Sequence, residues 1–325
     1  MATRPLGATG LQVTPIGLGL AALGRPAYIN LGREKDLGND RSIAALEERS
    51  HGVLNAAYDA GVRYVDAARS YGFAEQFLAS WLDTRKPEDL MVGSKWGYRY
   101  VADWRMDAEV NEVKDHSLAA LQRQIRESRA LLGNRLDLYQ VHSATLESGI
   151  LDDQKVLAEL ARLRADGLAI GLTVSGPAQA AVIRRAIRVT VDGVNPFQTV
   201  QATWNVLEPS AGPALAEAHA AGWGVIIKEA LANGRLTPGN PKPGVGVLRD
   251  VAETIGTTID AVAVAAALAN PWVDVVLSGA ATIEQLHSNL RAVDLDPSPG
   301  DLDRLAALGE PADSYWTRRR SLPWV

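Results

Sequence analysis

The sequence predicts a single α/β domain over residues 1–325, folded as a (β/α)8 TIM barrel, and three observations support this. The chain has 325 residues, which is within the size of one such barrel. Apolar residues make up 47% of it, enough for a large core. Short apolar runs alternate with longer amphipathic segments eight times without a clear mid-chain boundary. A closed barrel is therefore favoured over an open doubly wound sheet.

Eight segments are expected to form the strands. Each is a nearly continuous apolar run, as expected for strands that are covered on both faces. They are residues 15–22, 64–68, 90–96, 136–142, 169–175, 199–205, 224–231 and 274–279. The hydrophobic window 261–280 is interrupted by Asn270, Pro271 and Asp274, so it predicts a helix followed by a buried strand and not a membrane span.

The segments between the strands carry helix patterns with recognisable ends. Residues 153–167 place leucines and Val156 on one face and stop at Gly167. Residues 210–222 begin with a serine and end with a glycine. Residues 282–290 open with a T-x-x-Q capping box formed by Thr282 and Gln285.

Three segments lie outside the repeat. Residues 3–14 read as two short strands around a Gly-Ala-Thr-Gly turn, a β-hairpin that is expected to plug the bottom of the barrel. Residues 24–44 form a long polar loop after the first strand. Residues 310–325 form a tail rich in Trp, Arg and Pro. Both are expected at the carboxyl-terminal face, where barrel active sites lie.

Composition narrows the classes of function. The net charge is −5 and the basic triplet Arg318–Arg320 stands alone, so nucleic acid is not an expected partner. The absence of cysteine excludes disulfides, thiolate nucleophiles and cysteine-bound metals, and the five histidines show no metal spacing. No apolar stretch of signal-peptide length occurs at the N-terminus, so a cytoplasmic protein is expected. The sequence contains no pattern that indicates the oligomeric state.

Four titratable residues stand at or just after the carboxyl ends of three consecutive strands: Asp66, Tyr71, Lys95 and His142. These ends lie side by side in a barrel. An ammonium about 4 Å from a phenol favours the phenolate by up to roughly 4 kcal/mol at an effective dielectric of 20, or at most about three pKa units. An aspartate would keep that lysine charged, and an imidazole would orient a substrate carbonyl. The set predicts a tyrosine acid/base that works beside a hydride source, hence a nicotinamide.

This pattern resembles the aldo-keto reductases. The likeness extends over GLQVTPIGLGL, GVRYVDAARSYG, VGSKWG, DLYQVHS, IGLTVSG, VQATWN and SGAATIEQLHSNL, which is nearly the whole chain. It implies NAD(P)-dependent interconversion of a carbonyl (aldehyde, ketone or sugar) and an alcohol. In that scheme Tyr71 is the proton donor, Lys95 and Asp66 tune it, and His142 orients the substrate.

The resemblance also implies a set of positions that bind NADP or NAD: Thr173, Gln201, Lys228, Leu231, Ser278, Gly279, Gln285 and Asn289. Two positions depart from the family pattern: Val174, next to Thr173, stands where asparagine is usual, and Lys228 stands where the family has the tyrosine that stacks on the nicotinamide. The window 279–289 contains no Arg or Lys to meet a 2′-phosphate. We therefore expect weak discrimination in favour of NADP, or a preference for NAD.

Three tryptophans close to strand ends, Trp96, Trp104 and Trp204, are candidates for the substrate pocket. A G-x-G-x-x-A match at 17–22 is discounted as a dinucleotide fingerprint because no helix follows it. Two other functions stay open. One is a nicotinamide-binding regulatory subunit with little turnover, and the other is a barrel aldolase that uses Lys95 as a Schiff base.

Overall fold

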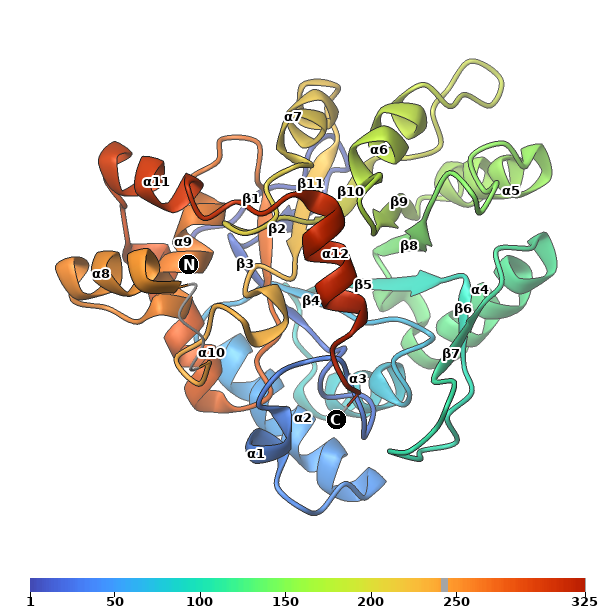
Figure 1. Cartoon of the computed structure of the whole chain (residues 1–325). Helices are drawn as coiled ribbons and strands as arrows, with labels where there is room; N and C mark the ends of the chain where they lie inside the picture. Colours follow the sequence, from blue (N-terminus) through green and yellow to red (C-terminus); the bar gives the residue numbers. More distant parts are fainter. Residues whose placement is uncertain (241–244, 325) are drawn as a thin grey trace.

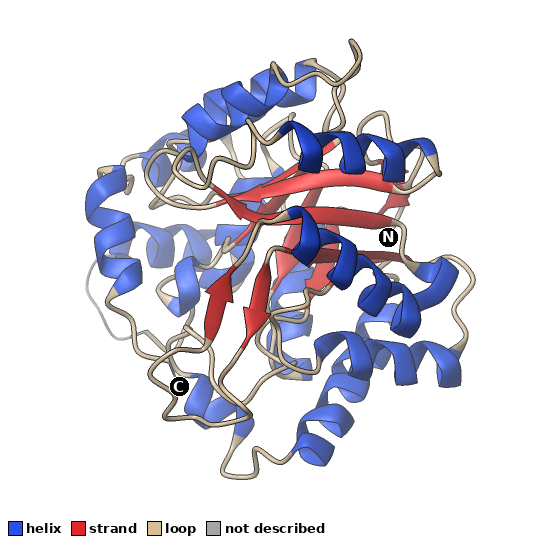
Figure 2. Cartoon of the chain, turned by 90° about the vertical axis from the view of Figure 1, so that its right-hand side faces the viewer, coloured by secondary structure: helices blue, strands red, loops and turns tan. Residues whose placement is uncertain are grey.

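The computed structural model describes residues 1–240 and 245–324. Its eight parallel strands form a closed barrel in the order β10-β11-β12-β3-β4-β5-β8-β9, and Figure 2 shows these strands surrounded by helices. The strands are β3 (Ile16–Gly19), β4 (Tyr64–Asp66), β5 (Met91–Trp96), β8 (Leu138–Ala144), β9 (Ala169–Val174), β10 (Thr199–Thr203), β11 (Gly224–Lys228) and β12 (Val275–Ser278). Each lies within, or extends, one of the eight predicted segments, so the predicted barrel is confirmed.

Helices follow the strands in the expected alternation (Figure 1). They are α1 (Arg33–Leu37), α2 (Ile43–Asp59), α3 (Ala74–Arg85), α4 (Leu118–Leu132), α5 (Gln154–Ala165), α6 (Gln179–Ile187), α7 (Gly212–Ala220), α8 (Gly246–Ile255), α9 (Ile259–Leu268), α10 (Ile283–Leu290), α11 (Pro299–Ala306) and α12 (Ala312–Arg320). Single-turn helices are η1 (Gly133–Arg135), η2 (Ala232–Gly234) and η4 (Arg291–Asp294). The predicted cap holds: Thr282 Oγ1 accepts the N–H of Gln285 at 3.2 Å, although Gln285 Oε1 bonds the N–H of Ala281 instead of that of Thr282.

The N-terminal hairpin closes the amino-terminal end of the barrel, as predicted. Strands β1 (Arg4–Pro5) and β2 (Gln12–Val13) pair antiparallel. Leu6 and Val13 are fully buried in a cluster with the first residues of several barrel strands, among them Tyr64 and Leu138. A Cβ on Gly224 would lie 2.6 Å from Cγ of Leu6, so only glycine allows the plug to seat this closely.

One pair of strands was missed by the sequence analysis. The segment after β5 forms the antiparallel hairpin β6 (Tyr98–Tyr100) and β7 (Glu112–Lys114). Both strands are three residues long and carry exposed polar side chains, so they lack the apolar run that marks a barrel strand. The hairpin is nevertheless important for the site because it carries Glu112 to the pocket.

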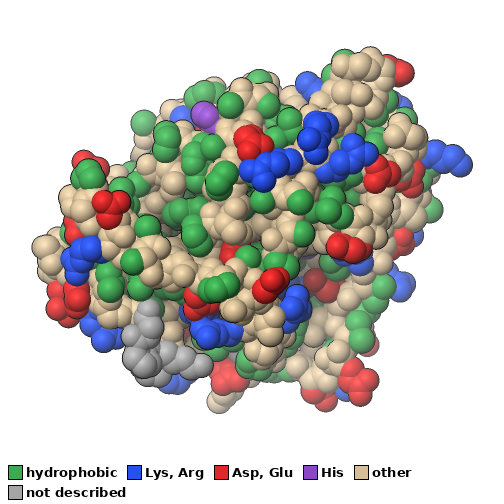
Figure 3. Space-filling model, turned by 45° about the horizontal axis from the view of Figure 1, so that its top comes forward, with side chains coloured by type: hydrophobic (Ala, Val, Ile, Leu, Met, Phe, Trp, Pro, Cys, Tyr) green, Lys and Arg blue, Asp and Glu red, His purple; other side chains and the backbone are tan. Residues whose placement is uncertain are grey.

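The C-terminal tail lies across the carboxyl-terminal face, as predicted, as far as residue 324, the last that the structure describes. Figure 1 shows α12 crossing in front of the barrel strands. Its Tyr315 and Trp316 are buried in a second apolar cluster with residues of α8 and α9. On the face shown in Figure 3, acidic and basic side chains lie next to one another without forming a field of one sign.

Helices α8 and α9 both connect β11 to β12, with α9 almost completely buried. Within residues 1–240 and 245–324, no single helix is long and apolar enough to span a membrane. The α8–α9 pair, bent by 90°, passes that test only when both helices are taken together.

Candidate active site

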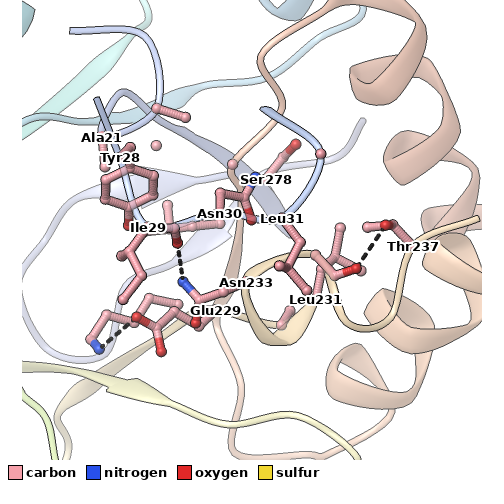
Figure 4. Close-up of a pocket in the computed structure, with 18 of the residues that line it drawn as sticks. Ala21, Tyr28, Ile29, Asn30, Leu31, Glu229, Leu231, Asn233, Thr237 and Ser278 are labelled. Atoms are coloured by element: carbon pink, nitrogen blue, oxygen red, sulfur yellow. Dashed lines mark hydrogen bonds and ion pairs between the residues drawn. The ribbon is translucent and has the colours of Figure 1, made fainter. Parts of the chain in front are cut away.

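A cavity of about 1000 Å³ opens at the carboxyl-terminal face of the barrel. Its walls come from the strand ends, the loop after β3, the loop after β11, the start of α10 and the C-terminal tail, and Figure 4 shows the part built by residues 28–31 and 229–237. Asp66, Tyr71 and His142 line one part of this cavity, and Ser278, Gly279, Gln285 and Asn289 line another. The structure therefore places residues of both predicted groups in one pocket.

Asp66 and Lys95 form an ion pair that is almost completely buried. Lys95 Nζ also donates to the carbonyl oxygen of Ala67 at 2.9 Å. Burial lowers the pKa of Lys95 and the Asp66 carboxylate opposes that shift. A buried ammonium held by two acceptors in this way is fixed in position, and it is poorly placed to act as a Schiff-base nucleophile.

The second carboxylate oxygen of Asp66 collects three further donors: the Tyr64 hydroxyl at 3.1 Å, Gln140 Nε2 at 3.1 Å and Gln201 Nε2 at 3.2 Å. The resemblance implied that Gln201 binds the cofactor. Gln201 lines the pocket, but its amide group donates a hydrogen bond to Asp66. The interior of the barrel thus holds the aspartate in place, since both of its carboxylate oxygens accept hydrogen bonds from buried donors.

The phenol of Tyr71 is enclosed by the predicted partners and by one that the sequence analysis missed. Lys95 Nζ is 4.7 Å from the centroid of its ring, and the imidazole of His142 meets it edge-on at 5.4 Å. The guanidinium of Arg25 lies 5.2 Å from the same centroid. Arg25 is itself buried and donates to Glu112 Oε2 at 2.9 Å and to the carbonyl of Ser70 at 3.1 Å.

The expectation that Lys95 lowers the pKa of Tyr71 is wrong for this structure. Burial, followed by the charge of Asp66, raises the pKa of the Tyr71 phenol well above its ordinary value, and Arg25 opposes the shift. The reason is that the carboxylate of Asp66 neutralises the ammonium of Lys95. The phenol is therefore next to a buried ion pair, which favours the phenolate less than an unpaired cation would. The Tyr71 phenol is therefore protonated near neutral pH.

His142 is buried and neutral. Burial, and then the positive charge of Lys95, lowers the pKa of the imidazole well below its usual value. Nδ1 lies 3.3 Å from the hydroxyl of Ser70, and the backbone oxygen of His142 accepts a hydrogen bond from His116 Nε2 at 2.9 Å. A neutral imidazole whose Nδ1 contacts the hydroxyl of Ser70 can donate one N–H to a substrate oxygen without adding charge.

Most of the residues predicted to bind the cofactor line the pocket, but Thr173 does not. Asn289 Nδ2 donates to Ser278 Oγ at 2.8 Å, and Leu231 and Lys228 also line the pocket. Thr173 does not: it is fully buried, and its hydroxyl accepts the N–H of Ser143 at 2.7 Å. Ser175, two residues further along, lines the pocket in its place.

The three tryptophans predicted to line the pocket pack elsewhere. Trp96 is fully buried against His116, Trp104 donates to the carbonyl of Arg41 at 2.8 Å, and Trp204 packs on Trp272. Neighbouring residues of a strand point to opposite faces, so Trp96 must leave the barrel interior that Lys95 enters. Because Trp96 directly follows Lys95 in the same strand, this alternation could have excluded Trp96 from the predicted pocket residues. Tyr28 and Trp324 line the pocket instead.

Two loops join across the pocket. The N–H of Leu31 donates to the carbonyl of Asn233 at 3.0 Å, and Asn233 Nδ2 donates to the carbonyl of Ile29 at 3.0 Å (Figure 4). Further out, Arg319 Nε on α12 lies 3.0 Å from both carboxylate oxygens of Glu229. Burial opposes ionisation of Glu229, but Arg319 and Lys228 more than compensate and lower its pKa to about 2.

The part of the pocket beside α10 fits a polar ligand such as a dinucleotide. Asn289 Oδ1 and Asp260 Oδ1 are buried, and neither has a hydrogen-bond partner among residues 1–240 and 245–324. Both residues line the pocket. Unpaired buried oxygens are costly unless a ligand supplies donors, and the hydroxyl and amino groups of an adenosine would do so.

Known proteins resemble this chain over most of its length. The model of the aldo/keto reductase family matches residues 15–310. An aryl-alcohol dehydrogenase [NADP(+)] of Phanerodontia chrysosporium is 25% identical over 91% of this chain and 82% of its own length. A D-threo-aldose 1-dehydrogenase of Pseudomonas sp. is 24% identical over 72% of this chain and 71% of its own.

The barrel also superposes on a solved structure, the holo form of the aldo-keto reductase AKR11C1 from Bacillus halodurans. The TM-score is 0.73 at 22% identity, with 96% of this chain and 97% of that chain covered. That similarity concerns the fold. The family match spans most of the chain, and the chain therefore belongs to the aldo/keto reductase family of NAD(P)-dependent oxidoreductases.

Proposed function

We propose that this protein interconverts a carbonyl compound and an alcohol, with Tyr71 as the proton-transferring residue and NAD or NADP as the hydride carrier. The observation that carries the proposal is the position of the Tyr71 phenol. It lies between Lys95, Arg25 and His142, in a pocket that continues to Ser278. A bound nicotinamide supplies or accepts the hydride at the substrate carbon.

The protein's own groups handle the oxygen of the substrate. In the reductive direction, the neutral imidazole of His142 donates a hydrogen bond to the carbonyl oxygen and orients it. As negative charge develops on that oxygen, Tyr71 gives up its hydroxyl proton and the alcohol forms. The phenolate that remains faces the ammonium of Lys95, which Asp66 holds in place. Oxidation of an alcohol reverses these steps.

We also propose that NAD is accepted at least as well as NADP. Asp260 and Glu284 line the pocket near α10, where a 2′-phosphate would add about 1.5 to 2 negative charges beside two carboxylates. The exposed Lys35 lies on the pocket wall as well, which is why weak discrimination is expected and not strict exclusion of NADP. A preference for NADPH of about a hundredfold or more, near 2.7 kcal/mol, would contradict this.

The lining near Tyr71 supports a small polar substrate. Hydroxyls of Ser143 and Ser175 and the ammonium of Lys228 line the pocket together with the aromatic rings of Tyr28 and Trp324. Hydroxyl and ammonium groups suit a hydroxylated aldehyde or alcohol, and aromatic rings suit the apolar face of a sugar or an aryl group. The relatives named for aryl alcohols and for D-threo-aldoses act on these two classes.

The test begins with a titration of the purified chain with NADH and NADPH, followed by oxidation and reduction assays on aldoses, polyols, aryl alcohols and aliphatic aldehydes. Turnover of at least one class that is abolished by Tyr71→Phe supports the proposal. Tight cofactor binding with no turnover across both directions favours the regulatory-subunit alternative. Failure to bind either cofactor contradicts both functions.

A further inference from the structure

A second lysine lies in the pocket besides the buried Lys95. Lys228, the last residue of β11, lines the cavity and has a side chain that is only 16% exposed. Its Nζ donates to the hydroxyl of Thr203 at 2.8 Å and to that of Ser175 at 3.2 Å. Both acceptors are neutral, so these two contacts orient the ammonium without cancelling its charge.

The nearest carboxylate is mainly engaged by another cation. Glu229 Oε1 is 3.9 Å from Lys228 Nζ, beyond hydrogen-bond distance, whereas Arg319 Nε reaches both carboxylate oxygens at 3.0 Å. Thr203 Oγ1 donates to Glu229 Oε2 at 3.0 Å. The group formed by Lys228, Glu229 and Arg319 therefore carries a net positive charge, with Lys228 on the pocket floor.

Lys228 lines the same pocket as Tyr71, in which a bound cofactor would have to react. Hydride and proton are delivered to the two atoms of one carbonyl, so a nicotinamide ring that acts with Tyr71 must lie close to that phenol. The rest of the dinucleotide has to run toward the polar wall formed by Ser278 and Asn289. The floor between these ends is made by the ends of β9, β10 and β11, where Thr203 pairs with Lys228.

We propose that Lys228 makes the site discriminate between the two redox states of the nicotinamide. The oxidised ring is a pyridinium cation and is repelled by the ammonium, whereas the reduced dihydropyridine ring is neutral and is not. The protein should accordingly bind NADH more tightly than NAD⁺ because of this residue. Each tenfold difference in the two dissociation constants raises the reduction potential of the bound two-electron couple by about 30 mV. This inference rests on the proposed function.

The discrimination should depend on pH. Burial lowers the pKa of Lys228 to about 8, with Glu229 opposing the shift, so the ammonium is present below about pH 8 and is lost above it. The charged neighbours are Glu229 on the same strand end, Arg319 on α12, Asp66 on β4 and Lys95 on β5. Glu229 has a pKa of about 2 and stays ionised near neutral pH.

Three other groups bear on the interpretation of such a titration. The pKa of Arg319 is raised above its ordinary value, so this residue stays charged. The pKa of His142 is well below 6.5, so its imidazole stays neutral. The pKa of Lys95 is also lowered by burial, so titration of Lys95 is a competing source of any pH dependence in the binding of NADH and NAD⁺.

The experiment measures dissociation constants of NADH, by its fluorescence, and of NAD⁺, by displacement of NADH, at about pH 6.5 and about pH 9.5. The full-length chain is compared with Lys228→Met, which removes the charge at similar volume, and with Lys228→Arg, which keeps the charge at all pH values. In the wild type, NADH should bind at least about tenfold more tightly than NAD⁺ at the lower pH, and this ratio should shrink to within about threefold at the higher pH. The methionine variant should show the small ratio at both pH values, and the arginine variant the large one.

Several results would overturn the inference. One is a wild-type ratio that does not change with pH, which decides the matter even if neither variant folds. Another is a large ratio retained by Lys228→Met. A third is a pH dependence retained by Lys228→Arg, since that would assign it to Lys95. Equal binding of NADH and NAD⁺ by the wild type contradicts only this inference, whereas failure to bind NADH, NAD⁺ and NADPH contradicts the proposed function as well.

Discussion

Arg319 and Glu229 are 90 residues apart in the chain, yet the guanidinium of the first lies against the carboxylate of the second, with Nε 3.0 Å from each oxygen. The contact ties α12 to the end of β11 across the pocket wall. The side chain of Glu229 is almost completely buried, and removal of the arginine would leave it with the hydroxyl of Thr203 and the more distant ammonium of Lys228. The C-terminal helix is therefore an integral part of the site.

Arg319→Ala should destabilise the protein by about 3–5 kcal/mol, because it leaves a buried carboxylate without its main partner. It should also raise KM more than it lowers kcat, since the tail that walls the pocket loses its anchor. Urea denaturation and steady-state kinetics measure the two effects. Arg318→Ala is the matched control: its exposed pair with Glu310 is worth at most about 1 kcal/mol. Equal effects of the two substitutions would contradict the assigned role.

Tyr71→Phe should lower turnover by about 10²–10⁴ while leaving the affinity for NADH near that of the wild type. The substitution removes the hydroxyl and keeps the ring that packs between Lys95 and His142. Stopped-flow or steady-state assays combined with a fluorescence titration separate the two quantities. Tyr58→Phe, which removes a hydroxyl bonded to Asp89 on the outside of the barrel, serves as the control and should retain turnover. Unchanged turnover in Tyr71→Phe would remove tyrosine from the mechanism.

Asp66→Asn should cost about 3–5 kcal/mol of stability, because it leaves the ammonium of Lys95 buried without its counter-ion. Adding Lys95→Met should recover much of that stability, since the pair is then replaced by neutral groups. Turnover should stay low in both proteins. Chemical denaturation of the two single variants and the double variant forms a double-mutant cycle. Additive losses of stability would show that the two residues are not coupled.

His116 should make the folded state sensitive to acid. Burial lowers the pKa of its imidazole to about 4, whereas the unfolded chain titrates near 6.5. Between these values the unfolded state binds more protons, so this contribution to stability falls as the pH falls below about 6.5.

The matched variant is His116→Gln, whose amide can still donate to the carbonyl of His142. The difference in unfolding free energy between wild type and variant should shift against the wild type by up to about 2 kcal/mol on going from about pH 7.5 to about pH 5. Urea denaturation at the two pH values gives this difference directly. Carboxyl groups with a raised pKa, such as the partly buried Asp137, titrate in both proteins, so their contributions cancel in the difference. A difference that does not change with pH would contradict a partly buried His116 that is neutral in the folded state.

The sequence alone was sufficient for the barrel and for the convergence of Asp66, Lys95 and His142. Parallel strands align their carboxyl ends, and alternation along each strand decides which side chains enter the barrel, so these residues meet whatever the loops do. The same alternation explains the error over Trp96, which is adjacent to Lys95 and points to the opposite face.

Only the tertiary structure decided the rest of the pocket. Arg25 comes from a loop and Glu112 from the unpredicted β6–β7 hairpin, while the Glu229–Arg319 contact joins segments far apart in the chain. None of these has a periodic signal, because loop conformations depend on long-range contacts. The raised pKa of Tyr71 has the same origin: a sequence shows that a lysine is near, but burial and the neutralising aspartate determine how much of its charge the phenol experiences.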